Sequence, residues 1–125
     1  MTMIVAYDGR QNTEKALEYA IKNASVYRES LRIITVLTKS NDAEISRVHD
    51  YMDKALEKAK ECGVDATITI ESGQPEKVIL QACSRFNCST IIVGRSSKTS
   101  FDRIVMGSVS NYIVANAKCT VIVVQ

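Results

Sequence analysis

Two short segments of the chain carry residues that could bind a ligand. Asp8 and Gly9 follow an apolar run, Met3 to Tyr7, that is typical of a buried strand. Gly94 follows a second apolar run, Thr90 to Val93, in the same way. In open parallel α/β sheets, ligands bind outside the carboxyl ends of the strands, where the strand order reverses. We therefore expect the two segments to form one ligand site.

The segment after the second run has the composition of a phosphate-binding loop. It contains small hydroxyl residues and three cations, Arg95, Lys98 and Arg103, and it reaches Gly107 and Ser108 where a helix is expected to begin. Glycine lets a bound group approach the backbone closely, and the amides of a first helical turn, with the helix dipole, suit an anion. This composition predicts phosphate binding.

Each of these residues also has an ordinary structural explanation. An Asp before a Gly commonly stabilises a turn, so Asp8 could serve only its own loop. Gly94 and Gly107 could simply end a strand and begin a helix, and the three cations could form a solvated surface. The sequence leaves both interpretations open.

The elements that must position these residues alternate between strand-like and helix-like patterns, which is typical of an α/β fold with a parallel sheet and crossover helices. Further strands are predicted over 31–37, 64–70 and 120–124, and helices over 16–24, 44–62, 75–86 and 109–117. The strict alternation over 64–70 indicates an edge strand. Expected helix ends include Asn12 or Thr13 and Asn41 as N-caps, Gly63 as a C-cap, and Pro75 as a first helical residue.

Length and composition limit the classes of protein that remain. The 125 residues fit one domain, 1–125, and 46% hydrophobic with 24% charged residues is typical of a globular protein. The net charge of +2 is far from the basic surface that binds nucleic acid, so no nucleic-acid partner is expected. No apolar run approaches the roughly 20 residues of a membrane span, and no leader precedes the first strand. We expect a cytoplasmic protein that does not associate with membranes.

The four cysteines show no motif of redox or zinc chemistry. Cys62, Cys83, Cys88 and Cys119 form no CxxC pair and do not combine with the single histidine, His49, at zinc-ligand spacing. We expect small, buried, reduced side chains, with a redox or metal role as the alternative.

A longer pattern connects the chain to a known family. The stretch GRSS, a nine-residue interval and GSVS resembles the universal stress protein motif of a glycine, two residues, a second glycine, nine residues, and a final glycine and serine. The resemblance extends over essentially the whole chain, because AYDG, ESGQP, TIIVG and the terminal VIVV occur where that family has similar segments.

The resemblance implies a Rossmann-like three-layer sandwich with a five-stranded parallel sheet in the order 3-2-1-4-5. In one branch of the family it also implies a bound ATP or AMP, with or without Mg. Asp8 would then accept hydrogen bonds from the ribose hydroxyls, while Ala6, Tyr7 and Val36 would border the adenine. The nucleotide-binding residues expected in this way are Ala6, Tyr7, Asp8, Val36, Val93, Gly94, Arg95, Ser97, Lys98, Gly107, Ser108, Val109 and Ser110.

Three positions depart from the family pattern. Ser97 stands at the second motif glycine, Arg10 replaces the serine that commonly follows the first Asp-Gly pair, and Thr120 stands where a proline often opens the last strand. If position 97 needs a positive φ, serine adds about 1 kcal/mol of strain and weakens phosphate binding.

The leading functional hypothesis is an adenine-nucleotide-binding stress protein that regulates without catalysis. The resemblance implies a homodimer joined along the fifth strand, and the apolar run Val121 to Val124 is compatible with such pairing. One alternative is a nucleotide-free interaction module, which Ser97 favours. The other is a slow ATPase or autophosphorylating protein, although the chain has no Walker GKS/T sequence and no histidine in the site loops.

Overall fold

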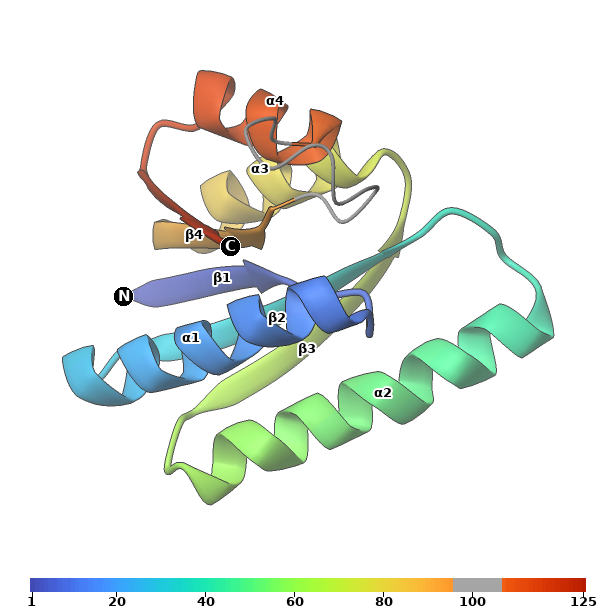
Figure 1. The fold of residues 1–125 in the computed structure, drawn as a ribbon, viewed down its shortest axis with the longest axis horizontal. Helices are drawn as coiled ribbons and strands as arrows, with labels where there is room; N and C mark the ends of the chain where they lie inside the picture. Colours follow the sequence, from blue (N-terminus) through green and yellow to red (C-terminus); the bar gives the residue numbers. More distant parts are fainter. Residues whose placement is uncertain (96–106) are drawn as a thin grey trace.

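A computed structural model describes residues 1–95 and 107–125, and within them five parallel strands form one sheet in the order β3-β2-β1-β4-β5 (Figure 1). The strands are β1 (Thr2–Ala6), β2 (Ser30–Leu37), β3 (Ala66–Ser72), β4 (Cys88–Gly94) and β5 (Thr120–Val124). The helices are α1 (Gln11–Tyr27), α2 (Asp42–Glu61), α3 (Pro75–Phe86) and α4 (Ser108–Asn116). The predicted fold class and strand order are confirmed.

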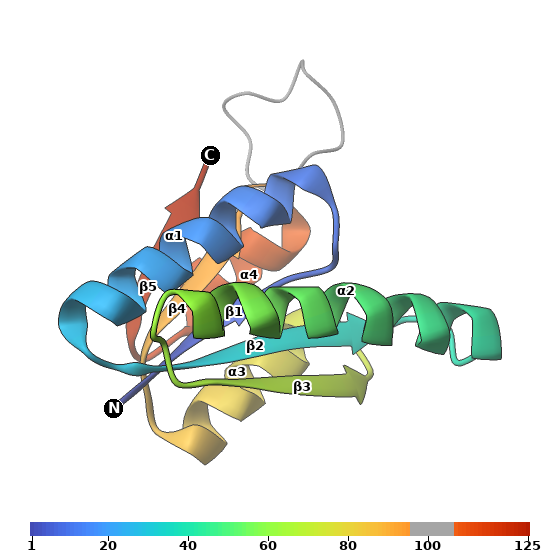
Figure 2. The same ribbon diagram turned by 90° about the horizontal axis from the view of Figure 1, so that it is seen from below.

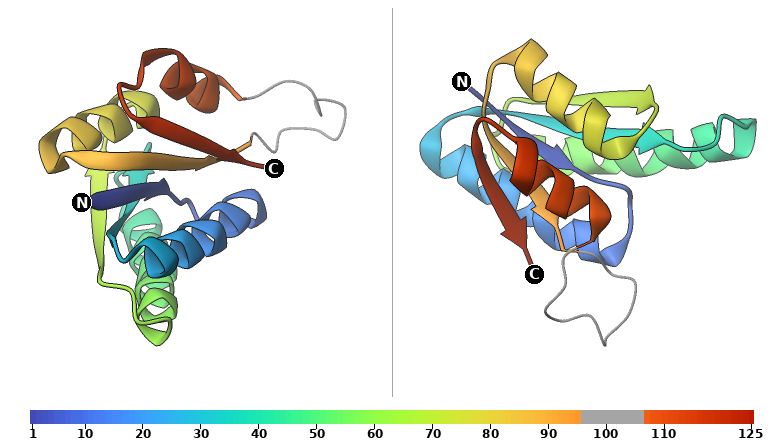
Figure 3. Two further views of the ribbon diagram at one scale, coloured as in Figure 1. Left: turned by 90° about the vertical axis from the view of Figure 1, so that its left-hand side faces the viewer. Right: turned by 90° about the horizontal axis from the view of Figure 1, so that it is seen from above.

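The sheet lies between two helical layers. Helices α1 and α2 cover one face, and α3 and α4 cover the other (Figures 2 and 3). The chain leads from β1 outward through β2 to β3 on one side of the sheet, and then crosses to β4 and β5 on the other side. Connections between parallel strands are right-handed, so those that run in opposite directions along the sheet place their helices on opposite faces. The strand order therefore reverses between β1 and β4, and the carboxyl ends of these two strands flank the reversal.

Each face of the sheet has its own buried core. Between the sheet and α1 and α2, the core includes Val5, Leu17, Ile33 and Met52. The opposite core, under α3 and α4, is smaller. Because both faces are covered, the central strands are apolar on both sides, which explains the continuous apolar runs in the sequence.

The predicted ends of the second and third helices are confirmed. The Asn41 side chain accepts a hydrogen bond from the Glu44 amide at 2.8 Å at the start of α2. Gly63 follows α2 with φ +72°, and Pro75 lies in the first turn of α3. Strand β3 is at the sheet edge, as its alternation predicted.

The predicted start of the first helix is wrong. Helix α1 begins at Gln11, Arg10 is its N-cap residue, and neither Asn12 nor Thr13 caps it. The Thr13 hydroxyl instead bonds to the carboxylate of Asp8, which draws the chain into the helix earlier. The third strand also begins later than predicted, at Ala66, because Val64 is buried at the turn after α2.

The expectation of buried, reduced cysteines is correct only in part, because Cys88 is buried and Cys62 and Cys119 are free thiols, but the other features differ. Cys83 and Cys88 form a disulfide, and Cys62 is exposed. Asn87, in the left-handed region at φ 53°, turns the chain sharply between α3 and β4. The Cα atoms of Cys83 and Cys88 therefore lie 4.8 Å apart, within the range that a disulfide spans.

Among the described helices, none combines the length and apolarity that crossing a membrane requires.

Candidate functional site

The carboxyl end of β1 leads into a tight turn built around Asp8. Its Oδ1 accepts hydrogen bonds from the Arg10 amide at 2.9 Å and from the Thr13 hydroxyl at 2.8 Å. Its Oδ2 lies 3.8 Å from Nε of Arg10, and the side chain is 47% exposed. Asp8 therefore has the turn-stabilising role that its position before a glycine allows. Only Oδ2 is left to face a ligand.

Gly9 is required in this turn for two separate reasons. Its φ of +81° is in the left-handed region, which L side chains rarely adopt. A Cβ at this position would also lie 2.8 Å from Cδ2 of Tyr51, a side chain of α2. The Tyr51 hydroxyl is 2.7 Å from Oγ1 of the buried Thr35 on β2, so the ring is held beneath the turn.

The end of β4 packs directly against the start of α1. A Cβ at Gly94 would lie 3.0 Å from the backbone oxygen of Asn12, so a larger residue would push the two segments apart. The Asn12 side-chain amide donates to the carbonyl of Arg95 at 3.3 Å. Its Oδ1 is buried and has no hydrogen-bond partner among the described residues. The first motif glycine thus brings β4 and the β1 turn side by side.

The first turn of α4 is hydrogen-bonded to the carboxyl end of β4. The hydroxyl of the buried Ser110 donates to the Gly94 carbonyl at 2.9 Å. Gly107 is the N-cap residue, and the bond from the Asn111 amide to its carbonyl, at 2.9 Å, is the first of the helix. The amides of Ser108, Val109 and Ser110 precede that bond, so they have no acceptor within the helix. They lie at the positive end of the helix dipole, where a negative charge is favoured.

Three apolar residues gather on one face of the sheet beside these groups. Ala6 on β1 and Val36 on β2 pack partly buried against the core under α3 and α4, and Val93 on β4 belongs to that core. The three come from adjacent strands of the sheet. They can provide an apolar floor at the carboxyl edge.

The Tyr7 side chain does not join this floor. It is buried in the opposite core, and its hydroxyl donates to Glu14 of α1. Burial, this hydrogen bond and the Glu14 charge raise the pKa of Tyr7 well above its ordinary value. Only the backbone of Tyr7 can border a ligand at the sheet edge. The expectation that Tyr7 borders the adenine therefore concerns its backbone and not its side chain.

Glu14 connects Tyr7 to the second helix. Lys58 of α2 lies 2.7 Å from a carboxylate oxygen of Glu14 and 3.5 Å from one of Glu18. Burial alone would raise the pKa of Glu14, but the hydrogen bonds from Lys58 and Tyr7 outweigh it and lower that pKa. This network joins α1 to α2 beneath the site.

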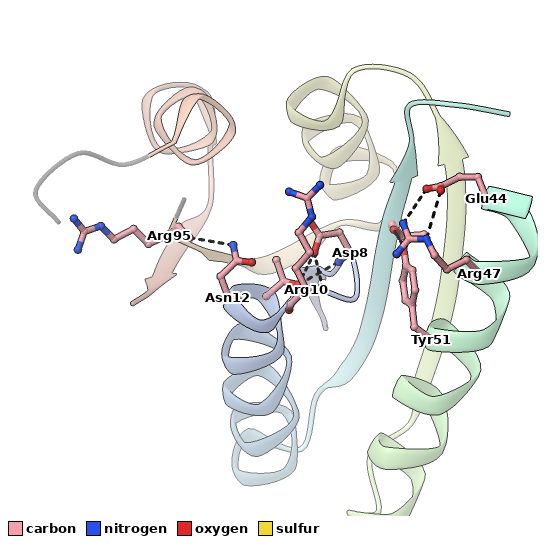
Figure 4. Close-up of polar contacts among 9 residues, drawn as sticks. Asp8, Arg10, Asn12, Glu44, Arg47, Tyr51 and Arg95 are labelled. Atoms are coloured by element: carbon pink, nitrogen blue, oxygen red, sulfur yellow. Dashed lines mark hydrogen bonds and ion pairs between the residues drawn. The ribbon is translucent and has the colours of Figure 1, made fainter. Parts of the chain in front are cut away.

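Arginines surround the carboxyl edge. The Arg10 side chain stands beside Asp8, whereas the Arg95 side chain points away from it (Figure 4). Arg47 of α2 pairs with Glu44 at 3.0 Å and stacks over the Tyr51 ring, 5.5 Å from its centroid. Arg10 and Arg47 each lie beside a carboxylate, which partly balances the positive charge at these two points. Arg10, which the sequence marked only as a departure from the family pattern, is the cation next to Asp8.

Two expected site residues, Ser97 and Lys98, lie outside the described residues, as do Arg103 and the hydroxyl residues of the same segment. Among the residues that the structure describes, Asp8 does not belong to any cluster of three or more His, Cys, Asp or Glu side chains that could hold a metal ion. In the described part of the chain, the one such cluster is Cys83, Cys88 and Cys119, far from this edge at the amino ends of β4 and β5.

Sequence reasoning missed Thr13 and Tyr51 as parts of the site. Thr13, five residues after Asp8, was interpreted as a helix cap, although a hydroxyl at that distance can equally bond back to the turn. Tyr51 had no local signal, because its contact with Gly9 depends on how α2 packs against the sheet.

Comparison with known proteins agrees with this arrangement. The model of the universal stress protein family matches residues 1–125. The universal stress protein YxiE of Bacillus subtilis is 28% identical to the chain over 144 aligned positions, which cover 98% of this chain and 97% of that protein.

Solved structures share the fold. Universal stress protein UspA from Lactobacillus plantarum has a TM-score of 0.89 and 21% identity, with 99% of this chain and 97% of that one covered. The Archaeoglobus fulgidus protein solved in complex with dAMP has a TM-score of 0.83 and 18% identity, covering 100% and 98%. A family protein from Arabidopsis thaliana with AMP bound has a TM-score of 0.72 and 20% identity, covering 98% and 90%. Because the family model matches the whole chain, this protein belongs to the universal stress protein family.

Proposed function

We propose that this protein binds an adenine nucleotide at the carboxyl edge of the sheet, between β1 and β4. The observation that carries the proposal is the convergence of three features at the strand-order reversal. These are the Asp8 turn, the close-packed end of β4 at Gly94, and the first turn of α4, which Ser110 ties to Gly94. The dAMP and AMP complexes of the two structural neighbours support this ligand class.

Each part of a nucleotide has a suitable counterpart at this edge. The adenine would rest on Ala6, Val36 and Val93, which are the apolar groups there. The ribose hydroxyls would donate to Oδ2 of Asp8, because Oδ1 already accepts two hydrogen bonds. The α-phosphate would meet the first-turn amides of Ser108 to Ser110, where a helix N-terminus favours an anion.

We propose AMP or ATP as the nucleotide. The first turn of α4 offers donors for one phosphate group, so AMP has all its parts matched by described residues. The outer phosphates of ATP, with any magnesium they carry, would have to be met by groups in addition to these. The role we propose for the bound nucleotide is regulatory and non-catalytic, and it would act by changing the conformation of the carboxyl ends of the strands.

We also propose a homodimer that forms through β5, because this strand is joined to the proposed nucleotide site. Strand β5 pairs with β4 on one side and is the last strand of the sheet, and Val121, Ile122, Val123 and Val124 are only partly buried. The Arg95 amide donates to the Val124 carbonyl at 2.8 Å, so the strand end next to the site is bonded to the proposed dimer strand. Sedimentation velocity at micromolar concentration would contradict the dimer if it found only monomer, with or without AMP.

The experiment that tests the nucleotide site is calorimetric titration of the purified protein with AMP, dAMP and ATP, and with UMP as the base control. We expect saturable binding of the adenine nucleotides and much weaker binding of UMP. Absence of binding to any adenine nucleotide at millimolar concentration would contradict the proposal.

That negative result would instead favour the second candidate function, a nucleotide-free interaction module. The observation behind this candidate is that the Asp8 carboxylate is already bonded to Arg10 and Thr13 within its own turn. The third possibility, autophosphorylation, would use hydroxyl groups of the 96–106 segment, which lies outside the described residues.

A further inference from the structure

Three cysteine sulfurs lie together at the amino ends of β4 and β5, at the opposite end of these strands from the proposed nucleotide site. Cys83 is in the last turn of α3, Cys88 opens β4, and Cys119 immediately precedes β5. The three sulfur atoms lie within 4.8 Å of one another. Cys83 and Cys88 form the disulfide, and Sγ of Cys119 is 3.5 Å from Sγ of Cys83 and 3.9 Å from Sγ of Cys88.

The environment of the cluster suits a chemical reaction more than simple packing. Cys88 is buried, but Cys83 and Cys119 are both partly exposed, so external reagents can reach them. The fourth cysteine, Cys62, is exposed at the end of α2 and does not belong to the cluster. A thiol beside a disulfide can exchange with it through attack of its thiolate on one of the two sulfurs.

We propose that Cys119 is the internal exchange partner of the Cys83–Cys88 disulfide, so that these three residues form a thiol–disulfide switch. Sγ of Cys83 is the preferred target because it is nearer to Cys119 and belongs to a more exposed residue than Cys88. The 3.5 Å separation is close to that of reacting atoms, and because Cys119 lies at similar distances from both sulfurs, rotation of its side chain must first bring its sulfur into line with the Cys83–Cys88 bond.

The exchange is balanced without any oxidant or reductant. The Cys119 thiol loses its proton, and its sulfur electron pair forms a bond to the Cys83 sulfur. The electron pair of the Cys83–Cys88 bond leaves on the Cys88 sulfur, which takes up a proton. One disulfide and one thiol are present before and after the step.

The switch changes which parts of the fold are covalently joined. The Cys83–Cys88 bond closes a connection with a sequence separation of 5 between α3 and β4. A Cys83–Cys119 bond closes one with a separation of 36 and ties α3 to the start of β5. Burial raises the pKa of the Cys119 thiol, so most of it stays protonated at neutral pH and the exchange is slow.

Peptide mapping tests the proposal directly, because the sequence places each cysteine in its own tryptic peptide. Cleavage after Lys77, Arg85, Arg95 and Lys118 gives peptides 78–85, 86–95 and 119–125, which carry Cys83, Cys88 and Cys119. The full chain would carry Cys62→Ser, which removes the unrelated exposed thiol. It would be oxidised with diamide, the diamide would be removed, and the folded protein would be incubated. Free thiols would then be alkylated with N-ethylmaleimide in denaturant.

We expect a peptide pair linking 78–85 to 119–125 to accumulate with time, while label on Cys88 rises in parallel. In the folded protein, the Cys83–Cys119 link should form in preference to the Cys88–Cys119 link. In a sample that is unfolded during the incubation, this preference should disappear. Cys119→Ser should show only the Cys83–Cys88 link. Cys88→Ser, which lacks the competing sulfur, should form the Cys83–Cys119 disulfide in most molecules.

Two results would overturn the proposal. One is the absence of any Cys83–Cys119 link in the folded protein together with failure of Cys88→Ser to form it. The other is a native mass showing a bound metal ion that Cys119→Ser releases, since the cluster would then be a metal site. Neither result depends on nucleotide binding at the opposite edge.

Discussion

The Ser110 hydroxyl donates a hydrogen bond to the Gly94 carbonyl at 2.9 Å, although the two residues are 16 positions apart in the chain. This bond ties the first turn of α4 to the end of β4, on either side of the 96–106 segment. The two ends of the expected phosphate-binding loop are therefore fixed to each other by one side chain, which is buried.

Replacing Ser110 by Ala should lower the free energy of unfolding by about 1 kcal/mol, the usual cost of losing such a hydrogen bond. Urea denaturation would measure the loss. Ser108→Ala is the matched control, because Ser108 is exposed in the same turn and its change should stay within about 0.5 kcal/mol. Equal effects of the two substitutions would contradict the importance of the bond to Gly94.

Glycines 9 and 63 allow a test of the contact between the β1 turn and Tyr51. Both have positive φ, +81° and +72°, but a Cβ at Gly63 meets nothing within 4 Å. Gly63→Ala should therefore cost only the backbone strain, about 1 kcal/mol. Gly9→Ala should cost at least about 1 kcal/mol more, because the added methyl group overpacks against the Tyr51 ring.

The comparison would again be made by urea denaturation. A second variant, Gly9→Ala with Tyr51→Leu, should recover part of the extra loss if the ring is its cause. The contact would be unimportant if Gly9→Ala and Gly63→Ala cost the same.

Glu14 should make the stability depend on pH at the acidic end. Its folded pKa is lowered, so its contribution is fully present above the ordinary value of about 4.3 and is lost as the pH falls through the lower folded pKa. Glu14→Gln removes this contribution. The difference in unfolding free energy between wild type and variant should be constant near neutral pH and shrink progressively below about pH 4.

Urea titrations at a series of pH values would check this. Glu61→Gln, at the exposed end of α2, is the control and should show no such convergence. A wild-type advantage that grows on acidification would mean that the sign of the Glu14 shift is opposite to the one described.

The sequence could predict which segments are strands and which are helices, because apolar residues recur with different periods in buried strands and in amphipathic helices. The strand order, in contrast, could be predicted only from the family resemblance. The alternation of side chains along a strand also indicates that the side chains of Ala6 and Tyr7 face opposite sides of the sheet, so only one of these two side chains can reach a ligand on a given face. The start of α1, the Gly9–Tyr51 contact and the Cys83–Cys88 disulfide could not be predicted. They depend on side-chain bonds and backbone turns that form only when distant elements pack.

Asp8→Asn should isolate the ribose contact from the turn. Asparagine keeps an oxygen for the Arg10 amide and the Thr13 hydroxyl, and it replaces only the ligand-facing carboxylate oxygen. AMP binding should weaken by about 1–2 kcal/mol, or about 5- to 30-fold in Kd. dAMP, which lacks one ribose hydroxyl, should lose less.

Calorimetry with both nucleotides would decide this, with Thr13→Val as the control that disturbs the turn but keeps the charge. Unchanged AMP affinity in Asp8→Asn would leave Asp8 with a structural role alone. Equal losses for AMP and dAMP would show that Oδ2 does not distinguish the two sugars.

The most direct test of the nucleotide site is an amide chemical-shift map of the isotopically labelled protein during titration with AMP. We expect saturable shifts at the carboxyl ends of the strands, in Asp8, Gly9, Gly94 and the first turn of α4, and negligible shifts at Cys88 and Cys119 at the amino ends. Shifts confined to the amino ends, or none at saturating AMP, would contradict the proposed site.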